Sequence, residues 1–482
     1  MDKNAITPTI NRVISKPEIL AALAGGVLLI ALIFFFKTSI VLAAFVGVLI
    51  GGFAFWMGFE YIPLIVFLQL AFSVELQIGS TTRLTIPTEI MVPLLFIAFA
   101  ISVIRSGKIS YRASQLNIAV IIMYFVMVAS YKYSFEPTST IKAIIRDTGY
   151  MGAGYFLIPQ YIRSEKHIKH ILYGCLGIHT LLVLYGFITQ VIGGLHIYGD
   201  IAAPFFVEHC IYAAYITISF AFVLPFYLTA DNQKNRFWLG VITTIFGAAI
   251  LLTFVRAAWI SVFVMLLFYL FQFRKRKSVI DLILLMIVGA LIGLVIAVST
   301  DIGEMILQRL DTITDTKYTA NLDRIDRWIV AWKIWIYNPI LGVGWGAYPD
   351  HYFKYADQAS AFYDAYFFNV PYSSAFRMGA HNIYLELLAE VGLVGLMAYL
   401  LIIYIFFRRA VIMQHKVKSE FQRIFLISTQ GAIITYLVHA FVNNLGPSDK
   451  MGITFWFLLG IVPTIEALYR SDQKNALKES SK

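Results

Sequence analysis

Charged side chains are scarce in this sequence. Asp, Glu, Lys and Arg together make up 14% of its 482 residues, against about 25% in an average soluble protein. Hydrophobic residues make up 59%. A soluble fold of this length needs a larger polar surface than the sequence supplies, so a soluble globular protein is excluded.

Cysteine is nearly absent as well. The two cysteines, Cys175 and Cys210, fall early in two predicted helices that run in opposite directions. We therefore expect them near opposite membrane faces, too far apart for a disulfide, and two thiols cannot build a cysteine metal site. No cleavable signal peptide is expected either, because residues 1–18 are polar and the apolar run at 19–36 is long enough to remain as a helix.

Long apolar runs, in contrast, fill nearly the whole chain. A bilayer core of about 30 Å requires about 20 apolar residues in a helix, and runs near this length recur throughout. The pattern predicts an all-α, polytopic membrane helix bundle, a single domain over residues 1–482 with about fourteen transmembrane helices. The expected spans are 19–36, 40–58, 61–74, 89–104, 116–131, 141–161, 169–191, 209–229, 237–254, 257–273, 279–298, 381–407, 424–441 and 451–469.

The positive charges indicate how the bundle is oriented. The net charge is +10. If the N-terminus is cytoplasmic, most Lys and Arg fall in short cytoplasmic segments, as the positive-inside rule requires. Both termini are then predicted to be cytoplasmic. Because the basic residues lie in short loops and not on one soluble face, nucleic-acid binding is not expected.

One connection is far longer than the others. Residues 299–380 are predicted to form an external loop that is partly helical. Loops longer than about 15 residues are usually functional or disordered, and the many Trp and Tyr residues of this one argue against disorder. Helical spacing over residues 324–337, followed by Asn-Pro, predicts a helix that ends there. Its tryptophan stripe favours packing on the bundle or at the membrane interface; a sugar-stacking platform is the alternative.

Cationic and titratable residues gather on the same external side. Arg256 sits between two apolar helices, Arg324 and Arg327 begin the predicted loop helix, and His381 opens the next transmembrane helix. Arginine binds phosphate through planar, charge-assisted hydrogen bonds, and histidine can remove a proton from an alcohol near neutral pH. Together they suit a transfer reaction with an anionic, membrane-held leaving group. For a single arginine at a membrane boundary, the alternative interpretation is that its side chain simply snorkels to water.

Two further cations lie near the outer end of the predicted 141–161 helix. Lys142 and Arg146 are functional candidates because charges inside a membrane usually are, and they would extend a cavity for a diphosphate or glycan. The alternative is that Arg146 pairs locally or snorkels. No metal and no cofactor are predicted, because the carboxylates of the long loop are spread out and we interpret them as solvated.

Three blocks of sequence within residues 322–400 resemble the superfamily of O-antigen ligases and Wzy-type polysaccharide polymerases. The blocks are Arg-Ile-Asp-Arg-Trp at 324–328, Asn-Pro-Ile-Leu-Gly-Val-Gly-Trp-Gly at 338–346, and His-Asn-Ile-Tyr-Leu-Glu-Leu-Leu-Ala-Glu-Val-Gly-Leu-Val-Gly at 381–395. The segment at Arg256 resembles the family's Ser-Arg-small segment, with Val255 where serine is common.

The resemblance implies a metal-independent glycosyltransferase of the bacterial inner membrane that acts at the external leaflet. Its donor would be a glycan on undecaprenyl diphosphate, and its acceptor a hydroxyl of a second glycan or glycolipid. Arg256 and Arg324 would match the family's two diphosphate-binding arginines, and His381 the histidine that activates the acceptor. Arg327, one helix turn from Arg324, is the reserve candidate.

Three alternatives remain open. Within the family, the number of helices and the length of the loop favour a polysaccharide polymerase, and an O-antigen ligase acting on lipid A-core is the other member. A glycan-lipid transporter or flippase is the rival class. It should place key charges near the bilayer midplane, often in repeated halves, whereas these charges cluster at one face and no internal repeat is visible. A ligand-sensing membrane receptor has no appended soluble domain to support it.

Overall fold

The structure is a computed structural model that describes residues 61–78, 82–107, 112–192, 201–274, 280, 283–284, 319–356 and 379–480. The predicted spans 19–36 and 40–58, and nearly all of 279–298, lie outside these residues.

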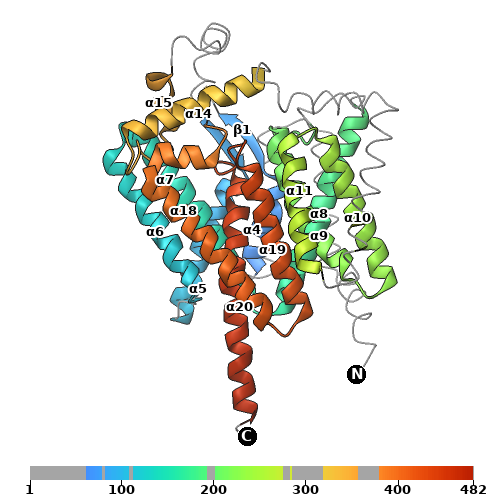
Figure 1. The fold of residues 1–482 in the computed structure, drawn as a ribbon. Coiled ribbons are helices and arrows are strands. Elements are labelled where there is room, and N and C mark those ends of the chain that lie inside the picture. The colour runs from blue at the N-terminus through green and yellow to red at the C-terminus, as the bar shows by residue number, and fades with distance from the viewer. Residues whose placement is uncertain are drawn as a thin grey trace.

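Long apolar helices stand side by side and form a bundle (Figure 1). Among the described residues, nine helices are long and apolar enough to cross a membrane. This confirms the all-α membrane bundle, but the predicted number of about fourteen is not confirmed. The nine are α5 (Thr88–Ser106), α6 (Gln115–Ser130), α8 (Glu165–Ile192), α9 (His209–Leu228), α10 (Gln233–Leu252), α11 (Arg256–Phe273), α18 (Ile383–Lys416), α19 (Glu420–His439) and α20 (Asp449–Ser480).

The centre of the bundle consists of α9, α19 and α20, whose apolar stretches are mostly buried. Helix α19 packs against both α9 and α11. The peripheral helices α5 and α10 instead expose large apolar side chains such as Ile104 and Phe237. In a bilayer such side chains face lipid, so the exposed apolar surface is what a spanning bundle requires.

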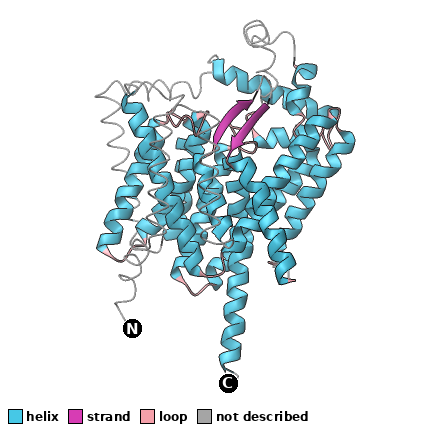
Figure 2. Cartoon of the chain, turned by 180° about the vertical axis from the view of Figure 1, so that it is seen from behind, coloured by secondary structure: helices cyan, strands magenta, loops and turns pink. Residues whose placement is uncertain are grey.

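Residues 61–74 do not form the predicted spanning helix. Helix α4 (Ile62–Gln69) and a 3-10 turn, η2 (Leu70–Phe72), together are too short to cross a bilayer. The chain then forms an antiparallel hairpin of β1 (Val74–Ile78) and β2 (Thr82–Ile86), drawn in magenta in Figure 2. The alternation of apolar and polar residues in β1 is typical of a strand.

The predicted 141–161 helix is composite. Helix α7 (Pro137–Met151) continues into a π-helical stretch, η4 (Gly152–Leu157), and a 3-10 turn, η5 (Ile158–Tyr161). At Gly154, within η4, an added Cβ would lie 2.8 Å from the Cβ of Trp456 in α20. The small residue therefore allows α7 and its extension to pack closely against α20.

Two helices of the long loop lie across one end of the bundle. They are α14 (Thr319–Tyr337) and α15 (Tyr348–Tyr355). The predicted helix over 324–337 is confirmed; it begins earlier and ends before the Asn-Pro pair. We call this end the α14 end. The C-terminal part of α20 extends from the opposite end (Figure 1). That the α14 end is external stays a prediction.

Candidate active site at the α14 end

His381 lies immediately before α18 in an unusual backbone conformation. Its φ angle is +51°, a left-handed value that is uncommon for residues other than glycine. The side chain of Asn382 caps α18 by accepting hydrogen bonds from the N–H groups of Tyr384 and Leu385, at 3.0 and 3.1 Å. The N–H of Ile383 donates to the carbonyl of Ala440 at the end of α19, at 3.0 Å. These contacts fix the position of the histidine.

Arg327 secures the chain on the other side of His381. Its side chain is 2% exposed, forms a 2.7 Å ion pair with Asp323, and donates to the carbonyl of Gly379 at 3.1 Å. Glu386, one turn into α18, accepts a 2.7 Å hydrogen bond from the N–H of Ala380. The two residues before His381 are thereby tied to both α14 and α18.

Arg324, one turn before Arg327, is different. It is half-buried, and with the described residues it forms no hydrogen bond and no ion pair. It is nevertheless close enough to act electrostatically on His381 and on His439 at the end of α19. A guanidinium in this position can donate its N–H groups to an anion.

His381 is held as a neutral imidazole. Burial, followed by the positive charges of Arg327 and Arg324, lowers its pKa to about 3. Its Nδ1 atom is buried and has no hydrogen-bond partner in the described part of the chain. A neutral ring can accept a proton. The positive charges that lower its pKa also attract an anionic group to the site.

The second sequence block, 338–346, is hydrogen-bonded into a break in α18. The break lies at Gly392, where φ is 64° and ψ is −165°. The N–H groups of Val343 and Gly344 donate to the carbonyls of Ala389 and Glu390 at 3.0 and 2.9 Å. Gly342, also at positive φ, lies so close to the Glu390 carbonyl that any Cβ would clash. The glycines of the second and third blocks thus allow two backbones to meet.

Arg256 is the first residue of α11. Two residues before it, Phe254 has a positive φ angle, as does His381, and these are the non-glycine residues with positive φ in the described chain. Helices α11 and α19 are antiparallel neighbours, and Tyr269 lies beside Gly431. From that contact, Arg256 is about 20 Å farther along α11 and His439 about 12 Å farther along α19, so both residues lie toward the α14 end.

Lys142 and Arg146 both lie on α7 at the α14 end. Arg146 donates two 2.9 Å hydrogen bonds to Asp147, which also accepts a 2.6 Å hydrogen bond from Trp345. Arg146 therefore has the local partner that the alternative interpretation expected. Lys142 is exposed. Neither is brought to His381 by a direct contact.

His439 is a residue that the sequence interpretation missed. It is 0% exposed, and neither ring nitrogen has a hydrogen-bond partner among the described residues. The Nδ2 atom of Asn443 and the Nε1 atom of Trp328 are also buried and unsatisfied there. An unsatisfied buried polar group costs about 1–3 kcal/mol and calls for an explanation. A histidine inside an apolar segment was the available signal.

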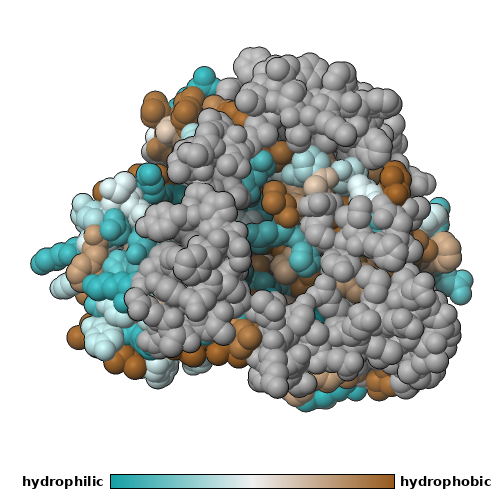
Figure 3. Space-filling model, turned by 90° about the horizontal axis from the view of Figure 1, so that it is seen from above, coloured by the Kyte–Doolittle hydropathy of each residue, from teal (hydrophilic) through white to brown (hydrophobic). Residues whose placement is uncertain are grey.

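We call His381, His439, Arg324, Trp328 and Asn443 the unpaired cluster. The face that carries α14 is hollowed near its middle, and hydrophilic side chains are visible in the hollow (Figure 3). A site for a polar, anionic ligand requires hydrogen-bonding groups without partners and a cation. This end of the bundle has both, together with a neutral imidazole.

The fold and this cluster define a multi-pass membrane protein with a cationic site at one end of its bundle. Residues 239–400, about a third of the chain, match the model of the family described as O-Antigen ligase. This stretch is therefore similar to that family, whose members are membrane proteins that transfer lipid-linked glycans as ligases or polymerases. No curated protein matches the sequence. The matched residues include Arg256, Arg324, Arg327 and His381.

Proposed function

We propose that the protein is a polysaccharide polymerase that transfers a glycan from undecaprenyl diphosphate to the hydroxyl of an acceptor glycan at the external leaflet. The observation that carries the proposal is the half-buried, neutral His381, whose buried Nδ1 atom has no partner among the described residues and which lies in the electrostatic field of Arg324. A base for the acceptor and a cation for the leaving group are the two functions that such a transfer requires.

In this mechanism Arg324 and Arg256 bind the diphosphate oxygens. His381 removes the proton of the acceptor hydroxyl while its oxygen attacks the anomeric carbon of the donor sugar. The new C–O bond forms as the bond between that carbon and the diphosphate breaks, and undecaprenyl diphosphate leaves with the bonding electron pair. The proton stays on the imidazole until it passes to solvent. Arg327 positions His381 by holding the Gly379 carbonyl.

Binding of the donor also prepares the base. Burial, followed by the charges of Arg327 and Arg324, lowers the pKa of His381 in the empty site. Two negative charges placed among them offset this effect, so the imidazole becomes more basic when the donor is present. The arginines then replace a divalent cation as the stabiliser of the leaving group, and we propose that the transfer is metal-independent.

One reconstitution experiment tests these points together. The purified full-length protein is mixed with a glycan on undecaprenyl diphosphate, with or without EDTA and with or without lipid A-core, and products are separated by length. We expect chain lengthening on the donor alone, unchanged by EDTA, and none with His381→Ala. His415→Ala, at the exposed far end of α18, is the matched control and should retain activity.

Two results would contradict the proposal in different ways. Loss of activity in EDTA with recovery in magnesium would overturn metal independence. Transfer only when lipid A-core is present would identify the protein as a ligase, with the same site and a different acceptor.

A further inference from the structure

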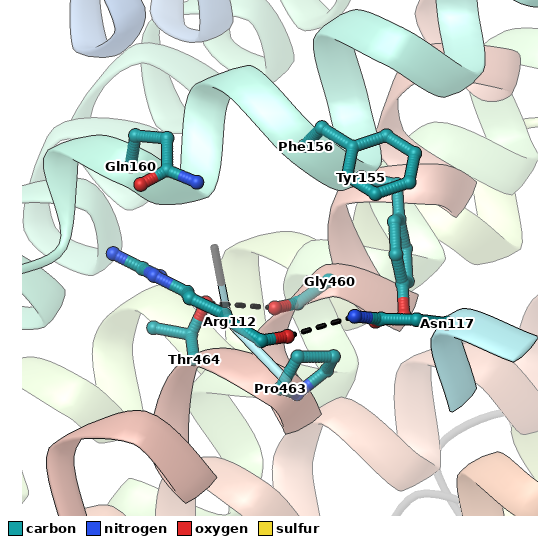
Figure 4. Close-up of a pocket in the computed structure, with 8 residues that line it drawn as sticks. All are labelled: Arg112, Asn117, Tyr155, Phe156, Gln160, Gly460, Pro463 and Thr464. Atoms are coloured by element: carbon teal, nitrogen blue, oxygen red, sulfur yellow. Dashed lines mark hydrogen bonds between the residues drawn. The ribbon is translucent and has the colours of Figure 1, made fainter. Parts of the chain in front are cut away.

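A second arginine site lies at the end of the bundle opposite the α14 end. Arg112, just before α6, donates to the side chain of Thr464 in α20 and, at 2.7 Å, to the carbonyl of Ile162. Its guanidinium points into a cavity between Gln160 and Thr464 (Figure 4). Asn117 donates to the Arg112 carbonyl at 2.8 Å, which fixes the backbone beside this cavity.

No acidic side chain in the described part of the chain pairs with the guanidinium of Arg112. The charged side chain that acts on it electrostatically is another cation, Arg163. Burial, followed by the charge of Arg163, lowers the pKa of Arg112 to about 10, so it remains charged at neutral pH. The buried acid closest along α20, Glu466, is already paired with Arg409 at 2.6 Å. A cation of this kind attracts an anion from outside the chain.

The size and position of the cavity restrict that anion. The cavity encloses about 30 Å³, within about 300 Å³ of space that is partly open to the outside. The enclosed part has room for one or two oxygen-sized atoms, so the rest of a ligand must stay outside. Thr464 lies in the last buried turns of α20, before its exposed polar end, and the apolar side chains of Ile104 and Ile118 are exposed nearby in sequence on α5 and α6. The cavity is therefore at the level where lipid meets solution.

We propose that Arg112, with Thr464 and Gln160, binds the phosphate of an anionic phospholipid head group at the end of the bundle opposite the unpaired cluster. Arginine forms charge-assisted hydrogen bonds with phosphate oxygens, and basic pockets between transmembrane helices bind lipid head groups in this way. A free phosphate ion has the same chemistry, but the lipid phosphates are already concentrated at this level.

The test uses native mass spectrometry of the full-length protein in detergent. It is titrated with dioleoylphosphatidylglycerol, with dioleoylphosphatidylcholine, or with inorganic phosphate. We expect phosphatidylglycerol to bind the wild type at least tenfold more tightly than phosphatidylcholine does. Arg112→Gln should lose roughly tenfold in affinity for phosphatidylglycerol, the size expected for one charged hydrogen-bonding group. Arg423→Gln is the matched control, since this exposed arginine at the same end already pairs with Glu420, and it should bind normally.

A second variant covers the case in which Arg112→Gln does not fold. Gln160→Glu leaves the hydrogen bonds of Arg112 in place and puts a negative charge in the cavity, so it should also lose the lipid. If inorganic phosphate binds as well as phosphatidylglycerol and competes with it fully, the lipid assignment is wrong. If both variants bind phosphatidylglycerol like the wild type, the cavity holds only water and the proposal fails.

Discussion

Two neighbouring regions at the α14 end differ in whether their polar groups have hydrogen-bond partners. Where residues 338–346 meet the break in α18, backbone N–H groups find carbonyls, and the N–H of Tyr348 donates to the Glu390 carboxylate at 3.1 Å. In the unpaired cluster, buried nitrogens of His381, His439, Trp328 and Asn443 have no partner in the described chain. In the first region the polar groups bond to one another and stabilise the fold, whereas in the second region they need a ligand to complete their hydrogen bonds.

The same contrast exists within one helix turn of α14. Arg327 is buried and pairs with Asp323 and Gly379, while Arg324 acts on two histidines and has no bonded partner among the described residues. Residues that stabilise the fold and residues that bind substrate can therefore be separated by mutation, even where they are adjacent.

The largest expected effect comes from separating these two arginines. Arg324→Gln should reduce transfer about 10²–10³-fold, the typical cost of removing one charge-stabilising donor, with an unchanged thermal midpoint. Arg327→Gln should instead cost about 3 kcal/mol of stability, because it breaks a buried ion pair and frees the Gly379 carbonyl. Activity assays and thermal unfolding of both variants measure this.

Arg324→Lys sharpens the distinction. Lysine keeps the charge but loses the planar fork, so transfer should recover only in part. The assignment of roles is reversed if Arg324→Gln unfolds more easily than the wild type while Arg327→Gln stays stable and inactive.

A smaller effect is expected at His439. His439→Phe removes two unsatisfied nitrogens at similar volume, so it should raise the thermal midpoint while lowering transfer about tenfold, the lower range for a group that contacts substrate. His179 provides the control, because its buried ring is hydrogen-bonded to Ser219 and, at 3.1 Å, to Tyr215. His179→Phe leaves those hydroxyls unpaired and should lower the midpoint.

The pair of substitutions decides what His439 does. If His439→Phe destabilises the protein as His179→Phe does and leaves transfer unchanged, His439 is only a packing residue. If it stabilises the protein and reduces transfer, its unsatisfied nitrogens belong to the site.

The sequence predicted the parts that depend on local pattern. Apolar runs gave nearly the full extent of α9, expected at 209–229 and found at His209–Leu228, because the length of a run determines a spanning helix. The β1–β2 hairpin was missed since five alternating residues beside a long apolar run carry little periodicity. Placement of Arg324 and His381 at the same end followed from the topology.

The sequence could not predict which polar groups find partners. The hydrogen bond from Arg327 to Gly379 depends on how α14 lies across the bundle, and the burial of His439 depends on how α19 packs. Both are consequences of tertiary contacts between segments far apart in the chain. The unpaired cluster was therefore visible only in part, as a group of charges, before the structure showed which of them lack partners.

The smallest expected effect is a shift in pH dependence, and it tests the electrostatics of the unpaired cluster directly. The dependence of kcat/KM on pH reports the free enzyme, and that of kcat reports the complex. His381 must be neutral to act as a base, and its pKa in the empty site is lowered to about 3 by burial, Arg327 and Arg324. Protonation therefore begins at lower pH than for an ordinary histidine, whose pKa is about 6.5.

We expect kcat/KM to stay level as the pH falls from about 8 to about 5. An ordinary histidine, with a pKa of about 6.5, would become protonated within this interval. The acid limb of kcat should lie at higher pH than that of kcat/KM, because the bound diphosphate offsets the arginines. In Arg324→Gln, one source of positive charge is gone, so the acid limb of kcat/KM, measured on the residual activity, should move up toward the ordinary value. Arg423→Gln, at the far end of the bundle, should leave both limbs in place. A wild-type kcat/KM that falls near pH 6.5 and does not respond to Arg324→Gln would show that the base is another group, or that Arg324 lies too far from His381 to affect it.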